Sequence, residues 1–168
     1  AIVSAAYAVY HGPQGIKKIA ESVSQLTKNF ADKLKQSGYE LYSNDFFDTV
    51  TIKTLDKTEK IYKNALDQGV NIRKVNSEML AVSFDERKNL YRANQLLKIF
   101  NCSETIKESM NESLSNIPKS LVRTSTYLDH PVFNSYHSET EMLRYLKKLE
   151  DSDIALNKSM IALGSCTM

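Results

Sequence analysis

The 168-residue sequence predicts an α+β fold in which helices cover one face of a small antiparallel sheet. Two observations carry this prediction. Apolar stripes at helical spacing alternate along the chain with paired runs of β-branched and aromatic residues. The two runs of each pair are separated by short turns, which favour antiparallel pairing. A hydrophobic content of 42% with 25% charged residues is typical of an ordinary globular protein.

The clearest helix begins at Gly12-Pro13, since proline is well tolerated at the first helical position. Its apolar stripe runs to Ser37-Gly38, where the glycine can adopt a left-handed turn. The stripe comprises Ile16, Ile19, Ala20, Val23, Leu26, Phe30, Ala31 and Leu34. The apolar residues 1–10 have no basic leader, and we interpret them as the end of a buried helix whose beginning lies outside this sequence.

Four strands are predicted at residues 39–43, 47–54, 70–75 and 79–84. Between the second and the third, Asp56-Lys57-Thr58-Glu59 has the spacing of a capping box and predicts a helix that ends at Gly69. After the fourth strand, Asp85 is expected to cap a last helix. The buried face of that helix is predicted to be Leu90, Ala93, Leu96, Leu97 and Phe100.

The chain changes character after this α+β domain, which we place at residues 13–102. Residues 103–127 are rich in Ser, Thr, Asn and Glu and predict a connector with one short helix around 106–114. In the following block, Ser138-Glu139-Thr140-Glu141 is again a capping box. The helix that it opens should turn Met142, Leu143, Leu146 and Leu149 inward. Residues 128–168 are too few to bury a core, so we expect them to dock on something larger.

Bulk composition excludes several classes of function. A net charge of +2 is too small to indicate a nucleic acid or an anionic membrane as partner. No apolar stretch reaches the roughly 20 residues that span a bilayer. Cys102 and Cys166 are far apart, which argues against a zinc site or a disulfide framework and favours a reducing compartment. The five glycines form no nucleotide-binding loop.

The three histidines suggest no metal site. His11 follows a helix and precedes Gly12-Pro13, where a histidine serves either as a hydrogen-bonded bracket between elements or as a ligand contact. His130 and His137 are seven residues apart, which is not the spacing of a helical zinc pair. We expect no metal. His137 could lie at the edge of the active site of a larger molecule.

The last residues, Gly164-Ser165-Cys166-Thr167, could form a loop near a phosphate-bearing cofactor, because hydroxyls and free backbone N–H groups bind phosphate. Cys166 has no base that can be assigned from the sequence, so we interpret it as part of the wall of such a site rather than as a nucleophile. Cys102, after a helix end, is interpreted as a buried spacer.

Four segments carry a resemblance to a known family: AYAVYHGPQGIKKIA, NDFFDTVTIKT, HPVFNSYHSETEMLRYLKKLE and SMIALGSCTM. Together they resemble the P-proteins of the glycine cleavage system, which are glycine decarboxylases, also called glycine dehydrogenases (decarboxylating). The resemblance covers almost the whole chain and is weakest over residues 103–127. The departures are small: the family's MAAMYAVYHGP stands here as VSAAYAVYHGP, and its IPLGSCTM as IALGSCTM.

The resemblance implies a fold type I pyridoxal-phosphate enzyme made of two homologous halves. Residues 1–12 would end a helix of the preceding large domain, and 13–102 would form the small C-terminal domain of the first half. After the connector at 103–127, residues 128–168 would be the helical start of the second, cofactor-bearing half. The family's Schiff-base lysine has no counterpart here, so we expect no catalytic residue in this segment and no activity from it alone.

The resemblance also implies pyridoxal-phosphate-dependent decarboxylation of glycine, with transfer of the aminomethyl group to the lipoyl arm of H-protein. The full-length protein would be a homodimer or a two-subunit heterotetramer, in the cytoplasm if bacterial and in the mitochondrial matrix if eukaryotic. The residues expected nearest the cofactor are His137, Ser138, Glu139, Thr140, Ser165, Cys166 and Thr167. The alternative is a stand-alone α+β interaction or regulatory module without catalysis.

Overall fold

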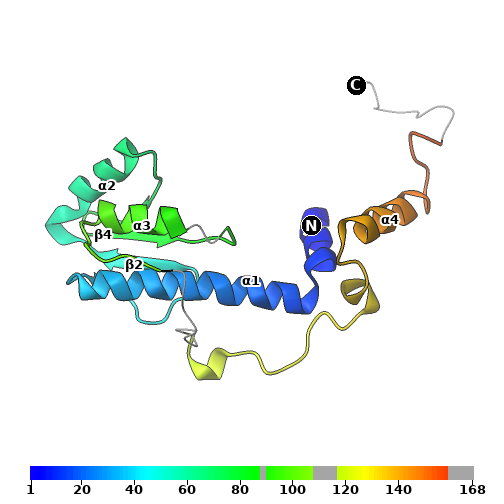
Figure 1. The fold of residues 1–168 in the computed structure, drawn as a ribbon, viewed down its shortest axis with the longest axis horizontal. Helices are drawn as coiled ribbons and strands as arrows, with labels where there is room; N and C mark the ends of the chain where they lie inside the picture. Colours follow the sequence, from blue (N-terminus) through cyan, green and yellow to red (C-terminus); the bar gives the residue numbers. More distant parts are fainter. Residues whose placement is uncertain (88–89, 108–116, 159–168) are drawn as a thin grey trace. The chain divides into compact units, whose positions relative to one another are not determined.

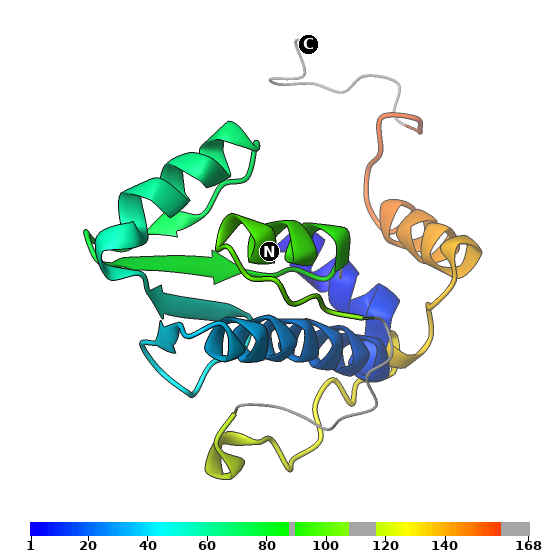
Figure 2. The same ribbon diagram turned by 60° about the vertical axis from the view of Figure 1, so that its left-hand side comes forward.

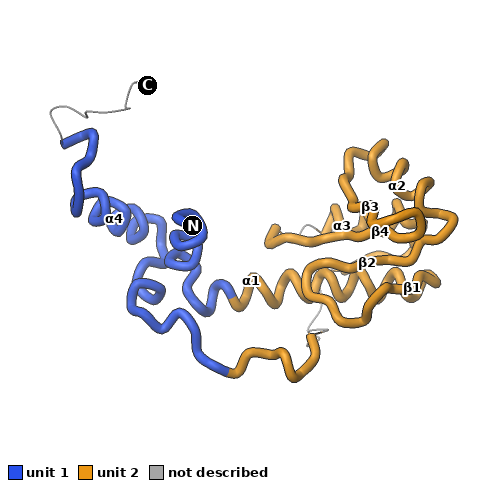
Figure 3. The backbone as a smooth tube through the Cα atoms, turned by 180° about the vertical axis from the view of Figure 1, so that it is seen from behind, with its two compact units in different colours: residues 1–16, 125–168 blue, residues 17–124 orange. Residues whose placement is uncertain are grey.

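The structure, a computed structural model, describes residues 1–87, 90–107 and 117–158. The chain divides into two compact units, coloured separately in Figure 3. Unit 1 combines residues 1–16 with 125–168, and unit 2 comprises residues 17–124. The first helix, α1 (Ile2–Gln36), begins in unit 1 and ends in unit 2, and it contains a kink at Gly12.

Unit 2 is an α+β domain built on a four-stranded sheet, as predicted. The sheet order is β1-β2-β4-β3 and every pairing is antiparallel. Figures 1 and 2 show α1 running alongside β2, and α3 beside β4. The elements are β1 (Glu40–Leu41), β2 (Thr49–Lys53), α2 (Thr58–Asp67), β3 (Arg73–Lys74), β4 (Met79–Ser83) and α3 (Leu90–Ile99), with single 3-10 turns at Leu55–Lys57 and Lys119–Leu121.

The central pair β2–β4 joins the two predicted hairpins into one sheet, with five residue pairs in register from Thr49 opposite Ser83 to Lys53 opposite Met79. Along β2, Val50 and Ile52 are buried while Thr49 and Lys53 are exposed. This alternation is that of a strand with one covered face. The helices therefore cover one side of the sheet, as the sequence indicates.

The core of unit 2 combines the covered side chains of the sheet with those of all three helices. Phe30 of α1 and Phe100, directly after α3, are completely buried. Their rings meet edge to face with centroids 6.2 Å apart, and Tyr39 packs on Phe100 at 5.7 Å. Aromatic rings in this arrangement attract each other beyond the area that they bury. The buried residues include the predicted Val23, Leu26, Ala31, Leu34, Ala93, Leu96 and Leu97.

The predicted capping box at Asp56–Glu59 is wrong. The 3-10 turn at Leu55–Lys57 runs directly into α2, so Lys57 occupies the N-cap position and its side chain makes no cap hydrogen bond. The hydroxyl of Thr58 donates to the Leu55 carbonyl at 2.7 Å and lies 2.6 Å from the Thr54 hydroxyl. Backbone bonds to the Glu78 carbonyl fix the turn, which leaves Asp56 exposed within it.

The two edge strands are shorter than predicted. β1 retains only two of the five residues 39–43, although Tyr42 still donates its N–H to the Thr51 carbonyl at 2.9 Å. β3 likewise retains two residues of 70–75. The predicted helix around 106–114 lies mostly outside the described residues. The start of α3 adjoins residues 88–89, which are also outside them, so the predicted cap by Asp85 is not described.

Unit 1 contains the first part of α1, the 3-10 turn Pro131–Asn134 and the helix α4 (Glu139–Glu150). Burial is nearly absent here. Val9 and Gly12 are buried, and no residue between 125 and 158 is. Residues 2–11 are helical as predicted, and Ile2 is 86% exposed in this chain. The leucines of α4 that were predicted to face inward are exposed. Among the described residues, no helix is long and apolar enough to cross a membrane.

We predict that Phe30→Ala lowers the free energy of unfolding of unit 2 by about 3–5 kcal/mol, because it opens a cavity beside Phe100. The control is Tyr91→Ala on α3, where the ring is 73% exposed and the expected change is within about 0.5 kcal/mol. Urea unfolding of the 168-residue chain measures both. Equal effects of the two substitutions would contradict the core described here.

Candidate functional site

The candidate residues around His137 lie beside a break in α1. At Gly12 the backbone has φ 61° and ψ 179°, a combination open essentially to glycine alone. The next residue, Pro13, has no N–H to donate. The helical hydrogen bonds are therefore interrupted, and carbonyl groups just before the break lose their helical donors.

Residues 125–137, which we call the brace, form hydrogen bonds on both sides of the break. The hydroxyl of Tyr127 donates to the Pro13 carbonyl at 2.7 Å. The Nδ1 atom of His137 lies 2.8 Å from the Tyr10 carbonyl oxygen. A carbonyl only accepts, so this Nδ1 carries a proton, and in the neutral ring Nε2 is then the acceptor. His137 is thus a hydrogen-bonded bracket across 127 residues of sequence.

The brace also passes close to Gly12. A Cβ atom on Gly12 would lie 2.6 Å from Cε1 of His137 and 2.7 Å from the carbonyl oxygen of Phe133. Both distances are well inside van der Waals contact. The position therefore requires glycine for two independent reasons, its dihedral angles and the absence of a side chain.

The brace is held in shape by its own hydrogen bonds. The amide of Asn134 donates to the carbonyls of Leu128 and His130, at 3.0 and 3.2 Å. The N–H of Val132 donates to Nδ1 of His130 at 3.2 Å. Leu128 has φ 54°, an uncommon value for a leucine. These local hydrogen bonds stabilise the positive φ of Leu128 in a segment that buries no residue.

The predicted capping box at Ser138 is confirmed. The Ser138 hydroxyl accepts from the Glu141 N–H at 3.3 Å, while the Glu141 carboxylate accepts from the Ser138 N–H at 3.1 Å and from its hydroxyl at 2.8 Å. These bonds to Ser138, first through its side chain and then its backbone, lower the pKa of Glu141. The fully exposed carboxylate therefore stays charged at the positive end of the helix dipole.

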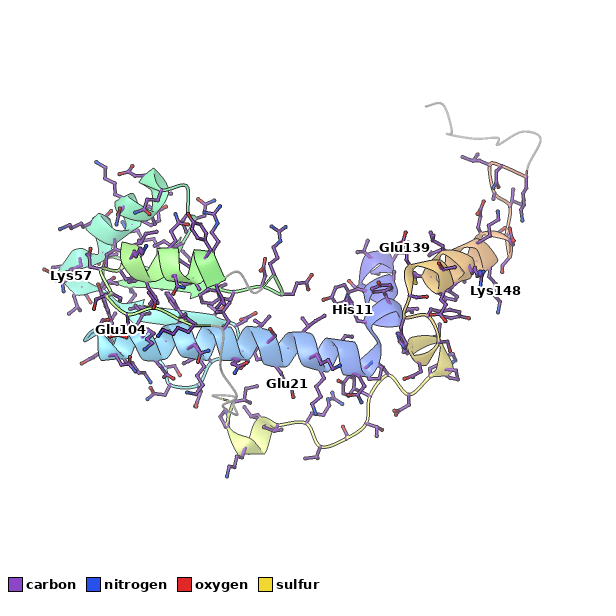
Figure 4. All side chains as sticks on the ribbon, in the orientation of Figure 1. His11, Glu21, Lys57, Glu104, Glu139 and Lys148 are labelled. Atoms are coloured by element: carbon purple, nitrogen blue, oxygen red, sulfur yellow. The ribbon has the colours of Figure 1, made fainter. Side chains whose placement is uncertain are left out.

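The structure divides the predicted site residues into three groups. His137 is hydrogen-bonded to the Tyr10 carbonyl of α1, and Ser138 caps α4, so both residues have structural roles. Glu139, labelled in Figure 4 at the start of α4, and Thr140 are exposed, and their side chains make no hydrogen bond or ion pair with the other described residues. The rest of the predicted set, Ser165, Cys166 and Thr167, lies outside the described residues.

Gly12 and Tyr127 were not predicted as parts of this arrangement. A signal for them exists in the sequence, because a Gly-Pro break leaves carbonyls without helical donors and histidine and tyrosine side chains can supply them. His11, for which a bracket was one interpretation, makes no hydrogen bond among the described residues. Its ring packs on Tyr7 with centroids 4.3 Å apart.

The remaining titratable candidates have structural explanations. Cys102 is buried as predicted, and burial raises the pKa of its thiol, so it is not an activated nucleophile. His130 accepts a backbone N–H inside the brace. Across 1–87, 90–107 and 117–158, no group of three His, Cys, Asp or Glu side chains could hold a metal ion.

The start of α4 does not fit a pyridoxal phosphate group by itself. Free N–H groups at a helix start attract phosphate. Here, however, the first turn carries the carboxylates of Glu139 and Glu141, which repel an anion. The Ser138 hydroxyl already donates to Glu141. The described residues therefore offer no complete phosphate cradle.

The fold defines a class, an α+β domain with helices on one side of an antiparallel sheet, joined to a helical unit with almost no core of its own. Comparison with known families then identifies the family to which the chain belongs. The profile of the family described as "Glycine cleavage system P-protein" matches residues 1–100, which is more than half of the chain. The chain belongs to this family.

Individual relatives agree with this membership. The chain is 98% identical over 168 residues to Glycine dehydrogenase (decarboxylating) of Pelagibacter ubique, covering 100% of the chain and 18% of that protein. It is 47% identical over 172 residues to Glycine dehydrogenase (decarboxylating) of Photobacterium profundum, an alignment that covers 99% of this chain and 18% of that protein. It is 47% identical over 167 residues to Glycine dehydrogenase (decarboxylating) 2 of Colwellia psychrerythraea, which covers 96% of this chain and 17% of that protein. The chain thus spans less than one fifth of the length of these relatives.

We predict that Gly12→Ala destabilises unit 1 more than Gly38→Ala destabilises unit 2. Both glycines have positive φ, so each substitution adds backbone strain of about 1–2 kcal/mol. Only Gly12 adds a steric clash, since nothing lies within 4 Å of a Cβ on Gly38. Thermal unfolding compares the two. Combining Gly12→Ala with His137→Ala should recover only part of the loss, because the Phe133 carbonyl remains in the way.

We also predict that Ser138→Ala costs about 1 kcal/mol of helix stability by removing the cap. In the same variant the pKa of Glu141 should rise toward its ordinary value. Because the folded pKa is lowered, the stabilisation is present above the ordinary glutamate pKa and is lost as the pH falls through the folded pKa. NMR titration of the Glu141 carboxylate in both proteins measures this. An unchanged titration in the variant would contradict the capping box.

Proposed function

We propose that this chain is part of an enzyme that decarboxylates glycine with pyridoxal phosphate and transfers the aminomethyl group to the lipoyl arm of H-protein. One observation carries the proposal, the 98% identity along all 168 residues to a protein named Glycine dehydrogenase (decarboxylating). At this identity nearly every side chain is the same. We therefore propose that the chain forms the same region of the same kind of enzyme as the matched region of that relative.

Pyridoxal phosphate, when bound, would accept the electrons left by loss of CO2, which is chemistry that no side chain supplies. The described residues hold no complete site for it, so we derive no step of the reaction from them. Ser165, Cys166 and Thr167 remain proposed as part of the wall near its phosphate. The family's Schiff-base lysine has no counterpart among the 168 residues.

The contribution that we propose for this segment is the placement of residues 137–140. The hydrogen bond to the Tyr10 carbonyl fixes the imidazole ring of His137, and the capping box fixes the next residue, Ser138. Glu139 and Thr140 then follow on a defined first turn with their side chains free. Positioning of this kind can contribute to a reaction without any group in the segment reacting.

The relatives named above are bacterial proteins, and we therefore propose a cytoplasmic location. Each relative is a single chain more than five times longer than this segment, since the segment covers 17–18% of it. A chain of that length favours the fused form of the family, with both halves in one polypeptide. Of the two expected assemblies, a homodimer is then the one that we propose.

The test uses the full-length protein with pyridoxal phosphate and glycine labelled at the carboxyl carbon. We expect labelled CO2 to be released in the presence of lipoylated H-protein, and not with H-protein that lacks lipoate. Addition of glycine should also change the visible absorbance of the cofactor. A protein that contains pyridoxal phosphate but shows neither response would contradict the proposal and favour the non-catalytic module.

A further inference from the structure

One face of α4 is apolar and has no cover among the described residues. We call the side chains of Met142, Leu143, Leu146 and Leu149 the α4 apolar face, since they share one side of the helix at steps of one, three and three residues. Leu143 is 59% exposed, Leu146 45% and Leu149 50%. The sequence predicts an inward orientation for all four, yet the three leucines face solvent in this chain.

The other side of α4 is satisfied by its own charges. The Lys147 ammonium lies 3.0 Å from the Glu150 carboxylate and 3.2 Å from that of Asp151. Lys158 also pairs with Asp151. The polar side therefore requires no partner. Directly after the helix, Ile154 and Leu156 add further apolar surface and are 85% and 72% exposed.

Energetics argue that the α4 apolar face is buried in the intact protein. A helix of 12 residues is marginal alone in water, and tertiary packing of its apolar side normally provides most of its stability. The capping box and the ion pairs add only modest amounts. A single exposed leucine is common on protein surfaces, whereas three on one helix face form a continuous patch of the kind that marks an interface.

We propose that the α4 apolar face packs against a part of the same polypeptide that lies outside these 168 residues. The relatives contain more than four fifths of their length beyond the region that this chain matches. Polypeptide joined covalently to α4 is present at an effective concentration of about millimolar. It therefore has an advantage over any separate protein for an apolar surface of this size.

The chemistry of the face also fits such an occupant. The α4 apolar face contains no charged side chain, so it cannot attract a charged partner electrostatically. A second apolar surface is the complementary partner for it. The inference extends the proposed function without resting on the proposed reaction, because burial can be measured without turnover. Loss of glycine decarboxylation would leave it intact.

Thiol labelling of the full-length protein tests the burial. Leu146→Cys places a thiol on the α4 apolar face, and Leu66→Cys on α2 is a matched control, since the two leucines are 45% and 46% exposed in this chain. The unsubstituted full-length protein gives the background labelling from its native cysteines. We expect the Leu146→Cys thiol to react at least about tenfold more slowly than the Leu66→Cys thiol, since it would react only after local opening. Equal rates would overturn the proposal.

Site-specific photocrosslinking identifies the occupant. With p-benzoylphenylalanine at position 146 of the full-length protein, we expect crosslinks within one chain to residues outside the present 168. Crosslinks between two chains, or protection that disappears on dilution, would show that a second copy covers the face and would overturn the proposal. Crosslinks to residues within the 168 would also overturn it.

If a substitution at position 146 prevents folding, hydroxyl-radical footprinting of the unsubstituted protein replaces the labelling experiment. Leu143, Leu146 and Leu149 should then be modified at least about tenfold more slowly than Leu66. Equal modification of the four leucines would overturn the proposal.

Discussion

The break in α1 is the constraint on which the organisation of unit 1 depends. Because Pro13 has no N–H and Gly12 has φ 61°, the helix cannot continue its hydrogen bonds through this point. The Tyr10 carbonyl, which precedes the break, accepts instead from His137, and Tyr127 donates to the Pro13 carbonyl on the other side of the break. The Tyr127 bond is half-buried and the His137 bond is exposed, and together they attach the brace to α1. The start of α4, with the candidate residues 138–140, follows directly from that attachment.

The two units reach order by different means. Unit 2 has an aromatic and aliphatic core in which Phe30, Phe100 and the covered strand residues are completely or nearly completely buried. In unit 1, the described residues are ordered by hydrogen bonds, a capping box and ion pairs, with Val9 and Gly12 as the buried residues. Hydrogen bonds and exposed ion pairs specify geometry well but contribute little net free energy. A unit with defined hydrogen-bond geometry but few buried residues is suited to packing against other parts of a longer protein.

Sequence patterns predicted the elements of unit 2 well, because burial follows periodicity. The buried stripe from Val23 to Leu34 emerged as expected, and β2 lies within the predicted strand 47–54. The ends of the elements were less predictable. Residues 56–59 have the sequence of a capping box, but Leu55, with its positive φ, starts a 3-10 turn that places Lys57 at the N-cap and Thr58 at the helix start. Propensity also extends β1 beyond the two residues that pair in the sheet.

Of the candidate site, only the features formed by residues close in sequence were predictable. The capping box at Ser138 depends on residues three apart and was predicted correctly. The role of His137 depends on Tyr10, 127 residues earlier, and no local pattern connects them. The family resemblance points to His137 as close to an active site. The structure adds that one of its ring nitrogens is already occupied by the backbone, so any contact with a ligand involves the other edge of the ring.

The distance in sequence between Gly12 and the brace also affects the order of folding during synthesis. All the strands and helices of the unit 2 core are complete by residue 106, whereas Tyr127 and His137 are added later. At about 5–20 residues per second, the ribosome needs roughly 6–25 seconds to proceed from Pro13 to His137. The core of unit 2 can therefore condense first. The break in α1 remains exposed on the nascent chain until the brace emerges, so this joint is closed late.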